Sequence, residues 1–170
     1  MPAPSPTYER IRLPEQHFLF VEKTCAMDGP AIAAAMGAGF GAVYSFNAAH
    51  GISPVSTPVA LYPGMPEGGE MTFHAGFFLT AADAQKVPDL LAAKDASGAL
   101  TLETLPPGEA LRTTHVGPYA ALNEAHKALW DHMATNEIAP GPVVWENYID
   151  DPTSTPEDTL RTQIIRMIAT

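Results

Sequence analysis

The sequence predicts an α+β fold in which two similar halves, each with the order strand, helix, strand, strand, share one antiparallel sheet. Two observations predict this duplication. A Gly–Pro pair opens each predicted helix, first at Gly29–Pro30 and again 88 positions later at Gly117–Pro118. Tyr62 and Tyr148, 86 positions apart, each fall in the strand that follows such a helix. The two long helices would then lie on one face of the sheet, with a central ligand groove along the pseudo-two-fold axis.

The composition is that of one globular domain with an acidic surface. The 170 residues are 46% hydrophobic and 16% charged, which is enough apolar content for a full core. The formal net charge is -10, and no two of the nine Lys and Arg residues are adjacent. Because phosphate groups are bound by clustered basic residues, we expect no direct binding of nucleic acid or of anionic membranes. Positively charged small molecules would be attracted instead.

The expected compartment is the cytoplasm. Cys25 is the single cysteine, so no internal disulfide can form, which fits a reducing environment. We find no N-terminal signal and no run of about 18 apolar residues that would indicate a membrane-spanning helix.

The first half is predicted at about residues 17–80, within a single domain at 17–170. Residues 1–16 are rich in proline and are expected to form a flexible lead. From His17, the run HFLFVEK is apolar on both faces, which is typical of a buried strand. After the first helix, we expect one strand around Tyr62 and another at 71–79.

The second half is predicted at about residues 100–168, after a connection at 81–98 with a short helical piece. Strands at 100–105 and 110–115 are expected to form a hairpin around the Pro106–Gly108 turn. The next helix has an apolar stripe at helical spacing, made of Leu122, Ala125, Leu129 and Met133. Strands at 142–151 and 160–168 complete the half.

Glu146 interrupts an otherwise apolar and aromatic strand, PVVWENYIDD. Side chains two apart on a strand share a face, so Val144, Glu146 and Tyr148 point one way and Trp145 points the other. If that face lines a cavity, the carboxylate beside an aromatic ring can bind a cationic or hydrogen-bonding ligand. If it faces water, Glu146 is an ordinary surface charge.

Several segments of the second half resemble the GyrI-like small-molecule-binding family. They are LPPGEALRTTHVGPY at 105–119, WENYIDDP at 145–152, STPEDT at 154–159 and TQIIRMI at 162–168. That family also supplies the effector-binding domains of AraC-type and MerR-type multidrug regulators. The resemblance covers roughly residues 17–168, and no helix-turn-helix segment precedes residue 17, so a free-standing version is expected. The resemblance implies two βαββ halves that enclose a central ligand pocket.

The resemblance also implies which residues form the pocket. Glu146 would lie at its floor and meet the positive charge of a lipophilic cation, with Tyr148 beside it and Tyr62 facing it across the groove. Cation–π contact with either tyrosine would add about 0.5–2 kcal/mol.

Five further residues are candidates for the wall of this pocket. By strand position we expect His115, Phe18 and Phe20 there. Phe40 and Tyr44, four residues apart on the first helix, share a face and could lie over the groove. Packing in an ordinary core is the alternative for the last two.

No cofactor or metal is predicted. His126 and His132 are six residues apart on a helix, so they do not share a face as a metal-binding pair would. Ser45 lacks the setting of a nucleophile elbow, and the glycine-rich stretches lack the nucleotide-binding patterns.

Two other functions stay open beside ligand binding. Glu146 could act as general base, with Tyr148 or Tyr62 as proton donor, in a hydrolase of reactive electrophilic small molecules. The chain could instead be a protein-interaction module of the gyrase-inhibitor type, whose acidic balance permits contact with a basic protein partner.

Overall fold

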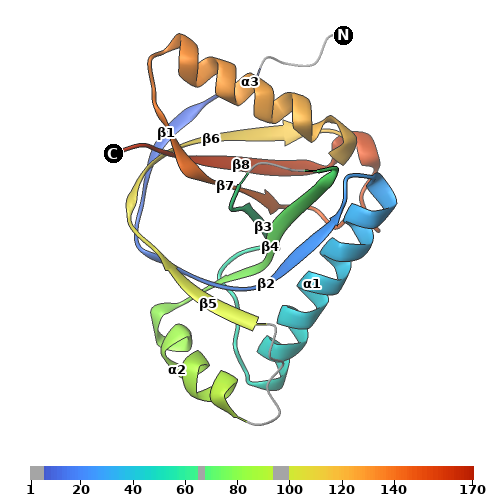
Figure 1. The fold of residues 1–170 in the computed structure, drawn as a ribbon, viewed down its shortest axis with the longest axis vertical. Coiled ribbons are helices and arrows are strands. Elements are labelled where there is room, and N and C mark those ends of the chain that lie inside the picture. The colour runs from blue at the N-terminus through green and yellow to red at the C-terminus, as the bar shows by residue number, and fades with distance from the viewer. Residues whose placement is uncertain (1–5, 65–67, 94–99) are drawn as a thin grey trace.

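The computed structural model describes residues 6–64, 68–93 and 100–170. Eight strands form one antiparallel sheet in the order β1-β6-β8-β7-β3-β4-β2-β5 (Figure 1). The strands are β1 (Glu9–Leu13), β2 (Gln16–Ala26), β3 (Val59–Tyr62), β4 (Glu70–Leu79), β5 (Leu100–Leu105), β6 (Gly108–Val116), β7 (Pro140–Tyr148) and β8 (Arg161–Ile168). The helices are α1 (Gly29–Ala49), α2 (Ala81–Ala92) and α3 (Leu122–Thr135), with short 3-10 turns at Tyr119–Ala121 and Glu157–Thr159.

The predicted fold class is confirmed. One half is β2-α1-β3-β4 and the other is β6-α3-β7-β8, and the two halves meet where β3 pairs with β7 in the middle of the sheet. The short helix predicted in the connection is α2, while residues 94–98 of that connection lie outside the described part of the chain.

The edge strands are exchanged between the halves, which corrects two predictions. β1 directly precedes β2 in sequence but pairs with β6, and β5 directly precedes β6 but pairs with β2. The hairpin expected at 100–115 is therefore wrong. The flexible lead expected at 1–16 is wrong for residues 9–13, which form β1, and residues 1–5 lie outside the described residues.

The sequences that connect these strands explain the exchange. β1 and β2 are joined through Pro14, and β5 and β6 through Pro106–Pro107. Proline has a fixed φ and no N–H donor, so these connections favour extended chain over a hydrogen-bonded hairpin turn. Leu13 and Leu105 then pack into the same apolar cluster from opposite edges of the sheet.

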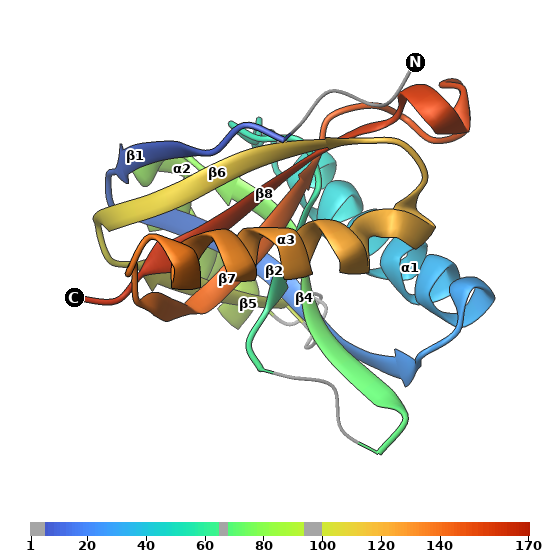
Figure 2. The same cartoon turned by 90° about the horizontal axis from the view of Figure 1, so that it is seen from above.

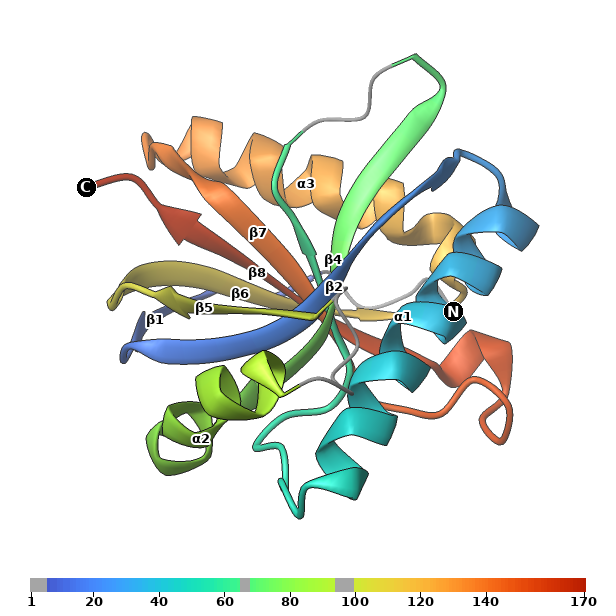
Figure 3. The same cartoon turned by 60° about the horizontal axis from the view of Figure 1, so that its bottom comes forward.

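The three helices pack on one face of the sheet. α3 contributes Leu129 and Met133 to a cluster with Ile164 of β8, and Figure 2 shows it lying across β6, β8 and β7. α1 packs on β2 and β4 and begins at the N-cap Asp28, whose side chain accepts a hydrogen bond from Ala31 N. Figure 3 shows α3 near β7 and α1 near β2 and β4.

α1 approaches the sheet most closely at Gly39. A Cβ added there would lie 2.7 Å from the Cβ of Ala75 on β4, closer than real Cβ contacts allow. By length and composition alone, α1 could cross a membrane, although the sequence predicted no such segment. In this fold it packs on the sheet through Val43 and Phe46, while Tyr44 on its outer side is exposed.

The opposite face of the sheet carries the aromatic part of the core. Phe18, Phe20, Phe78 and Trp145 cluster there, with rings within 5.1 to 5.6 Å of their neighbours. Because both edge strands contribute side chains to this cluster, the sheet is strongly curved around it (Figure 1).

Candidate functional site

Glu146 lies at the centre of the sheet, on the face that carries the helices. It is directly opposite Ala60 in the β3–β7 pair. Tyr62 is opposite Val144, and the backbone N–H of Tyr148 donates to Pro58 O. The two tyrosines therefore lie two residues away from the Ala60–Glu146 pair, one on each strand, as the pseudo-two-fold axis requires.

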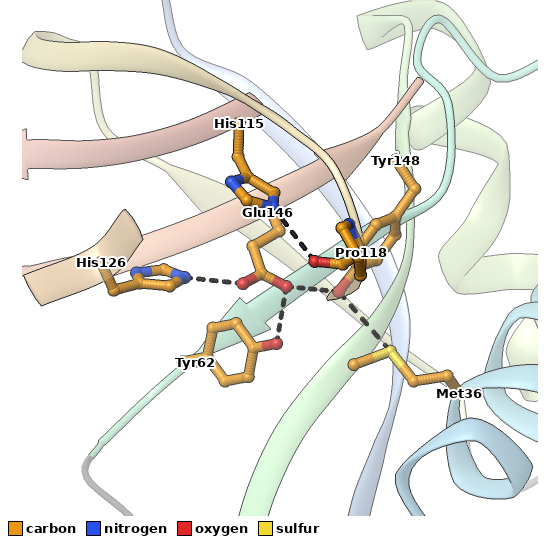
Figure 4. Close-up of polar contacts among 7 residues, drawn as sticks. All are labelled: Met36, Tyr62, His115, Pro118, His126, Glu146 and Tyr148. Carbon is orange, nitrogen blue, oxygen red and sulfur yellow. Dashed lines mark hydrogen bonds and ion pairs between the residues drawn. The ribbon is translucent and has the colours of Figure 1, made fainter. Parts of the chain in front are cut away.

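The carboxylate of Glu146 is buried but fully engaged in hydrogen bonds (Figure 4). Glu146 as a whole is 3% exposed to solvent. Oε1 accepts the hydroxyl hydrogens of both Tyr62, at 2.8 Å, and Tyr148, at 2.5 Å. Oε2 is 2.6 Å from Nε2 of His126. Three donors on two oxygens compensate the loss of hydration that burial of a carboxylate entails.

His126 is the residue that the sequence analysis missed. It lies on α3, 20 positions before Glu146, and its side chain is 23% exposed. Because a carboxylate only accepts, Nε2 of His126 carries the hydrogen in this contact. The sequence held part of the signal: His126 follows Leu122 by one helical turn and adjoins Ala125, so it falls at the edge of the apolar stripe, but this spacing does not identify Glu146 as its partner.

The two phenols at the carboxylate are held in their neutral form. Burial and the adjacent charge of Glu146 raise the pKa of Tyr62 well above its usual value. The same causes, in the same order, raise the pKa of Tyr148 well above that of a free phenol. Both hydroxyls are therefore protonated donors over the whole physiological range of pH.

Soft and aromatic side chains complete the surroundings. The Tyr148 hydroxyl lies 3.7 Å from Sδ of Met36 on α1. The ring of Phe40, one turn further along α1, packs edge-on against Tyr148 at 5.8 Å, and Tyr119 does so at 5.4 Å. Burial raises the pKa of Tyr119 above that of a free phenol, and Asp150 contributes.

The other predicted wall residues lie in different places. His115, at the end of β6, uses Nε2 to donate to Pro118 O at 3.1 Å and makes no hydrogen bond to Glu146 (Figure 4). Tyr44 is 66% exposed on the outer side of α1. Of these two residues of α1, Phe40 is the one that contacts Tyr148.

Phe18 and Phe20 do not lie beside Glu146. Both are buried on the opposite face, in the cluster that contains Trp145. The register decides this placement, since Val21 is in line with Ala75, Ala60 and Glu146, and neighbouring residues on a strand point to opposite faces. These two phenylalanines are thus core residues in this structure, which corrects the expected wall position.

The Glu146 cluster is closed by its own side chains. A cavity of about 190 Å³ lies elsewhere, on the opposite face beside Trp145, Leu105 and Met167, and Glu146 does not line it. A ligand that reaches Glu146 must therefore displace at least one of the side chains around it.

Comparison with known proteins agrees with this fold. The family model of the GyrI-like small molecule binding domain matches residues 6–169. No curated protein is significantly similar to the chain in sequence.

Several solved structures share the fold at low sequence identity. A hydrolase from Listeria innocua is 17% identical, with a TM-score of 0.66 over 98% of this chain and 94% of that one. The C-terminal domain of EcmrR is 15% identical, with a TM-score of 0.72 over 98% of both chains. SAV2435, bound to tetraphenylphosphonium, is 13% identical, with a TM-score of 0.60 over 96% of this chain and 94% of that one.

Proposed function

Because the chain belongs to the GyrI-like small-molecule-binding family, we propose that it binds a lipophilic organic cation whose positive charge lies against Glu146. The observation that carries this proposal is one carboxylate, 3% exposed, at the centre of the sheet. Within the described residues its only ion pair is with His126, so no Lys or Arg neutralises it there.

The surroundings of the carboxylate suit a cation with aromatic or aliphatic substituents. Tyr62, Tyr148, Tyr119 and Phe40 supply ring faces and edges, and Met36 supplies a polarizable thioether. The net charge of -10 raises the local concentration of cations near the protein. SAV2435, which has the same fold, is bound to such a cation, tetraphenylphosphonium.

The test is binding of tetraphenylphosphonium and of neutral triphenylphosphine oxide by calorimetry and by thermal unfolding. We expect the wild type to bind the cation more tightly than the neutral analogue. Glu146→Gln keeps the shape and the acceptor oxygen but removes the charge, so the Kd for the cation should rise on the order of 10- to 100-fold. The Kd for the neutral analogue should change little.

The matched control is Glu70→Gln, which removes the same charge from an exposed position at the start of β4. The change in the Kd for the cation in this variant measures the general attraction of cations by the net charge, which is weak and screened by salt. Equal cation affinity in wild type and Glu146→Gln would contradict the proposal, as would a cation affinity no higher than that for the neutral analogue.

A second candidate function is hydrolysis of a reactive electrophile. Glu146 would act as general base toward a water, and Tyr148 or Tyr62 would donate a proton to the leaving oxygen. The observation that favours it is the presence of two neutral phenols on one carboxylate oxygen, and a hydrolase from Listeria innocua has the same fold.

Product analysis distinguishes hydrolysis from binding alone. An epoxide with an aromatic substituent is incubated with wild type, Glu146→Gln and Tyr148→Phe, and the diol is quantified. Hydrolysis predicts diol formation that requires Glu146 and falls in Tyr148→Phe. Unchanged epoxide with all three proteins would leave binding as the function.

A further inference from the structure

His126 occupies the position that a ligand cation would take. Its Nε2 lies 2.6 Å from Oε2 of Glu146, while the other oxygen, Oε1, already accepts two phenol hydrogens. The carboxylate is nearly inaccessible to solvent, so no unoccupied side is left for a second positive group. A cation that approaches Glu146 therefore meets an imidazole already hydrogen-bonded to it (Figure 4).

We propose that His126 is the built-in competitor for the Glu146 carboxylate, so that a cationic ligand binds by displacing its imidazole from Oε2. This inference rests on the proposed function and adds the residue that determines its selectivity. A ligand must replace the hydrogen bond from the imidazole to the carboxylate, which a cation does through its charge and a neutral molecule without a donor does not. His126 thus excludes neutral aromatic compounds and admits cations.

Among the three donors, His126 is the one whose displacement costs least. Its side chain is 23% exposed, so the freed imidazole can be hydrated. The phenols are in a different position, since the Tyr148 hydroxyl is buried and has the Met36 sulfur at 3.7 Å as its further acceptor among the described hydrogen bonds. Sulfur is a weak acceptor, so a phenol displaced from the carboxylate would exchange a strong hydrogen bond for a weak one.

The experiment is calorimetry of tetraphenylphosphonium and triphenylphosphine oxide binding to wild type and to His126→Gln. The variant keeps a hydrogen-bond donor but cannot carry charge, so it should bind the cation roughly 3- to 10-fold more tightly.

The matched control is His132→Gln on the same helix. His132 stacks on Tyr8 with ring centroids 4.0 Å apart and has no contact with Glu146. This variant should behave as wild type in its affinity for both ligands. The affinity for triphenylphosphine oxide should rise in His126→Gln, because a neutral ligand then competes only with a neutral amide.

Two outcomes would overturn the inference. Equal cation affinity in wild type and His126→Gln would show that the imidazole does not compete. An unchanged affinity of His126→Gln for triphenylphosphine oxide would show that His126 does not exclude neutral ligands. Should His126→Gln fold poorly, His126→Asn provides the same comparison. In each case measurable cation binding leaves the proposed function intact, and its absence in every protein removes that function as well.

Discussion

The two halves share a βαββ order but hold their helices on the sheet differently. In the second half, α3 packs through large buried side chains, Leu129 and Met133. In the first half, α1 approaches the sheet at Gly39 and Ala75, where there is no side chain beyond a methyl group. The second half therefore depends on large buried side chains, whereas the first half combines the buried side chains of Val43 and Phe46 with a close approach of the backbone at Gly39.

The same contrast holds for chemistry. The pseudo-two-fold axis places Tyr62 and Tyr148 symmetrically, but the central pair is Ala60 on one strand and Glu146 on the other. α3 adds His126, whereas the only ionisable side chain of α1 is the exposed Tyr44. The second half thus supplies the charges and the first half supplies space and apolar contact, which shows how a duplicated scaffold gains one ligand site instead of two.

The largest expected effect on stability is in the second half. Leu129→Ala removes a fully buried side chain and should lower the free energy of unfolding by about 2–5 kcal/mol. Chemical denaturation measures the change. Ala134→Ser, on the exposed side of the same helix, should stay within about 0.5 kcal/mol of wild type. A loss below 1 kcal/mol in Leu129→Ala would mean that α3 is not held by packing.

A smaller effect on stability is expected in the first half, where alanine at two glycines of α1 should change the stability in opposite directions. In Gly39→Ala the new methyl would lie 2.7 Å from the Ala75 Cβ and 3.3 Å from Val21, so overpacking should cost about 1–3 kcal/mol. Gly41→Ala, on the same helix, meets nothing within 4 Å. It should stabilise the protein by about 0.5–1 kcal/mol through helix propensity. Equal stability of the two variants would refute the close approach of α1.

The fold and part of the site could be predicted because their signals are local. Helical spacing marks Leu122, Leu129 and Met133, which are buried as expected. Strand alternation places Tyr148 on the same side as Glu146. The offset between the halves brings in Tyr62, whose hydroxyl does reach the carboxylate.

The features that escaped prediction depend on long-range geometry. The contact of His126 with Glu146 requires the rotation of α3 over β7, which no local pattern encodes. The face on which Phe18 and Phe20 lie depends on the register of β2, β4 and β3 in turn, and a shift of one residue in any pair would reverse it. The exchange of β1 and β5 likewise reflects pairing between halves, which sequence proximity does not predict.

The smallest expected effect is a pH dependence of the free energy of unfolding that arises from Tyr62 and Tyr148. The folded-state pKa values of Tyr62 and Tyr148 are raised, so above about pH 10 the unfolded phenols ionise while the folded ones do not. Their contribution to stability is fully present below pH 10 and is lost as pH rises toward the folded pKa, at no more than about 1.4 kcal/mol per pH unit for each phenol.

The free energy of unfolding between pH 9.5 and 10.5 should fall more steeply in wild type than in the double variant Tyr62→Phe/Tyr148→Phe. The single variants should each remove part of the difference, because each half contributes one phenol to the same oxygen. If one tyrosine alone accounted for the pH dependence, the two donors would contribute unequally to the free energy of unfolding despite their symmetric positions.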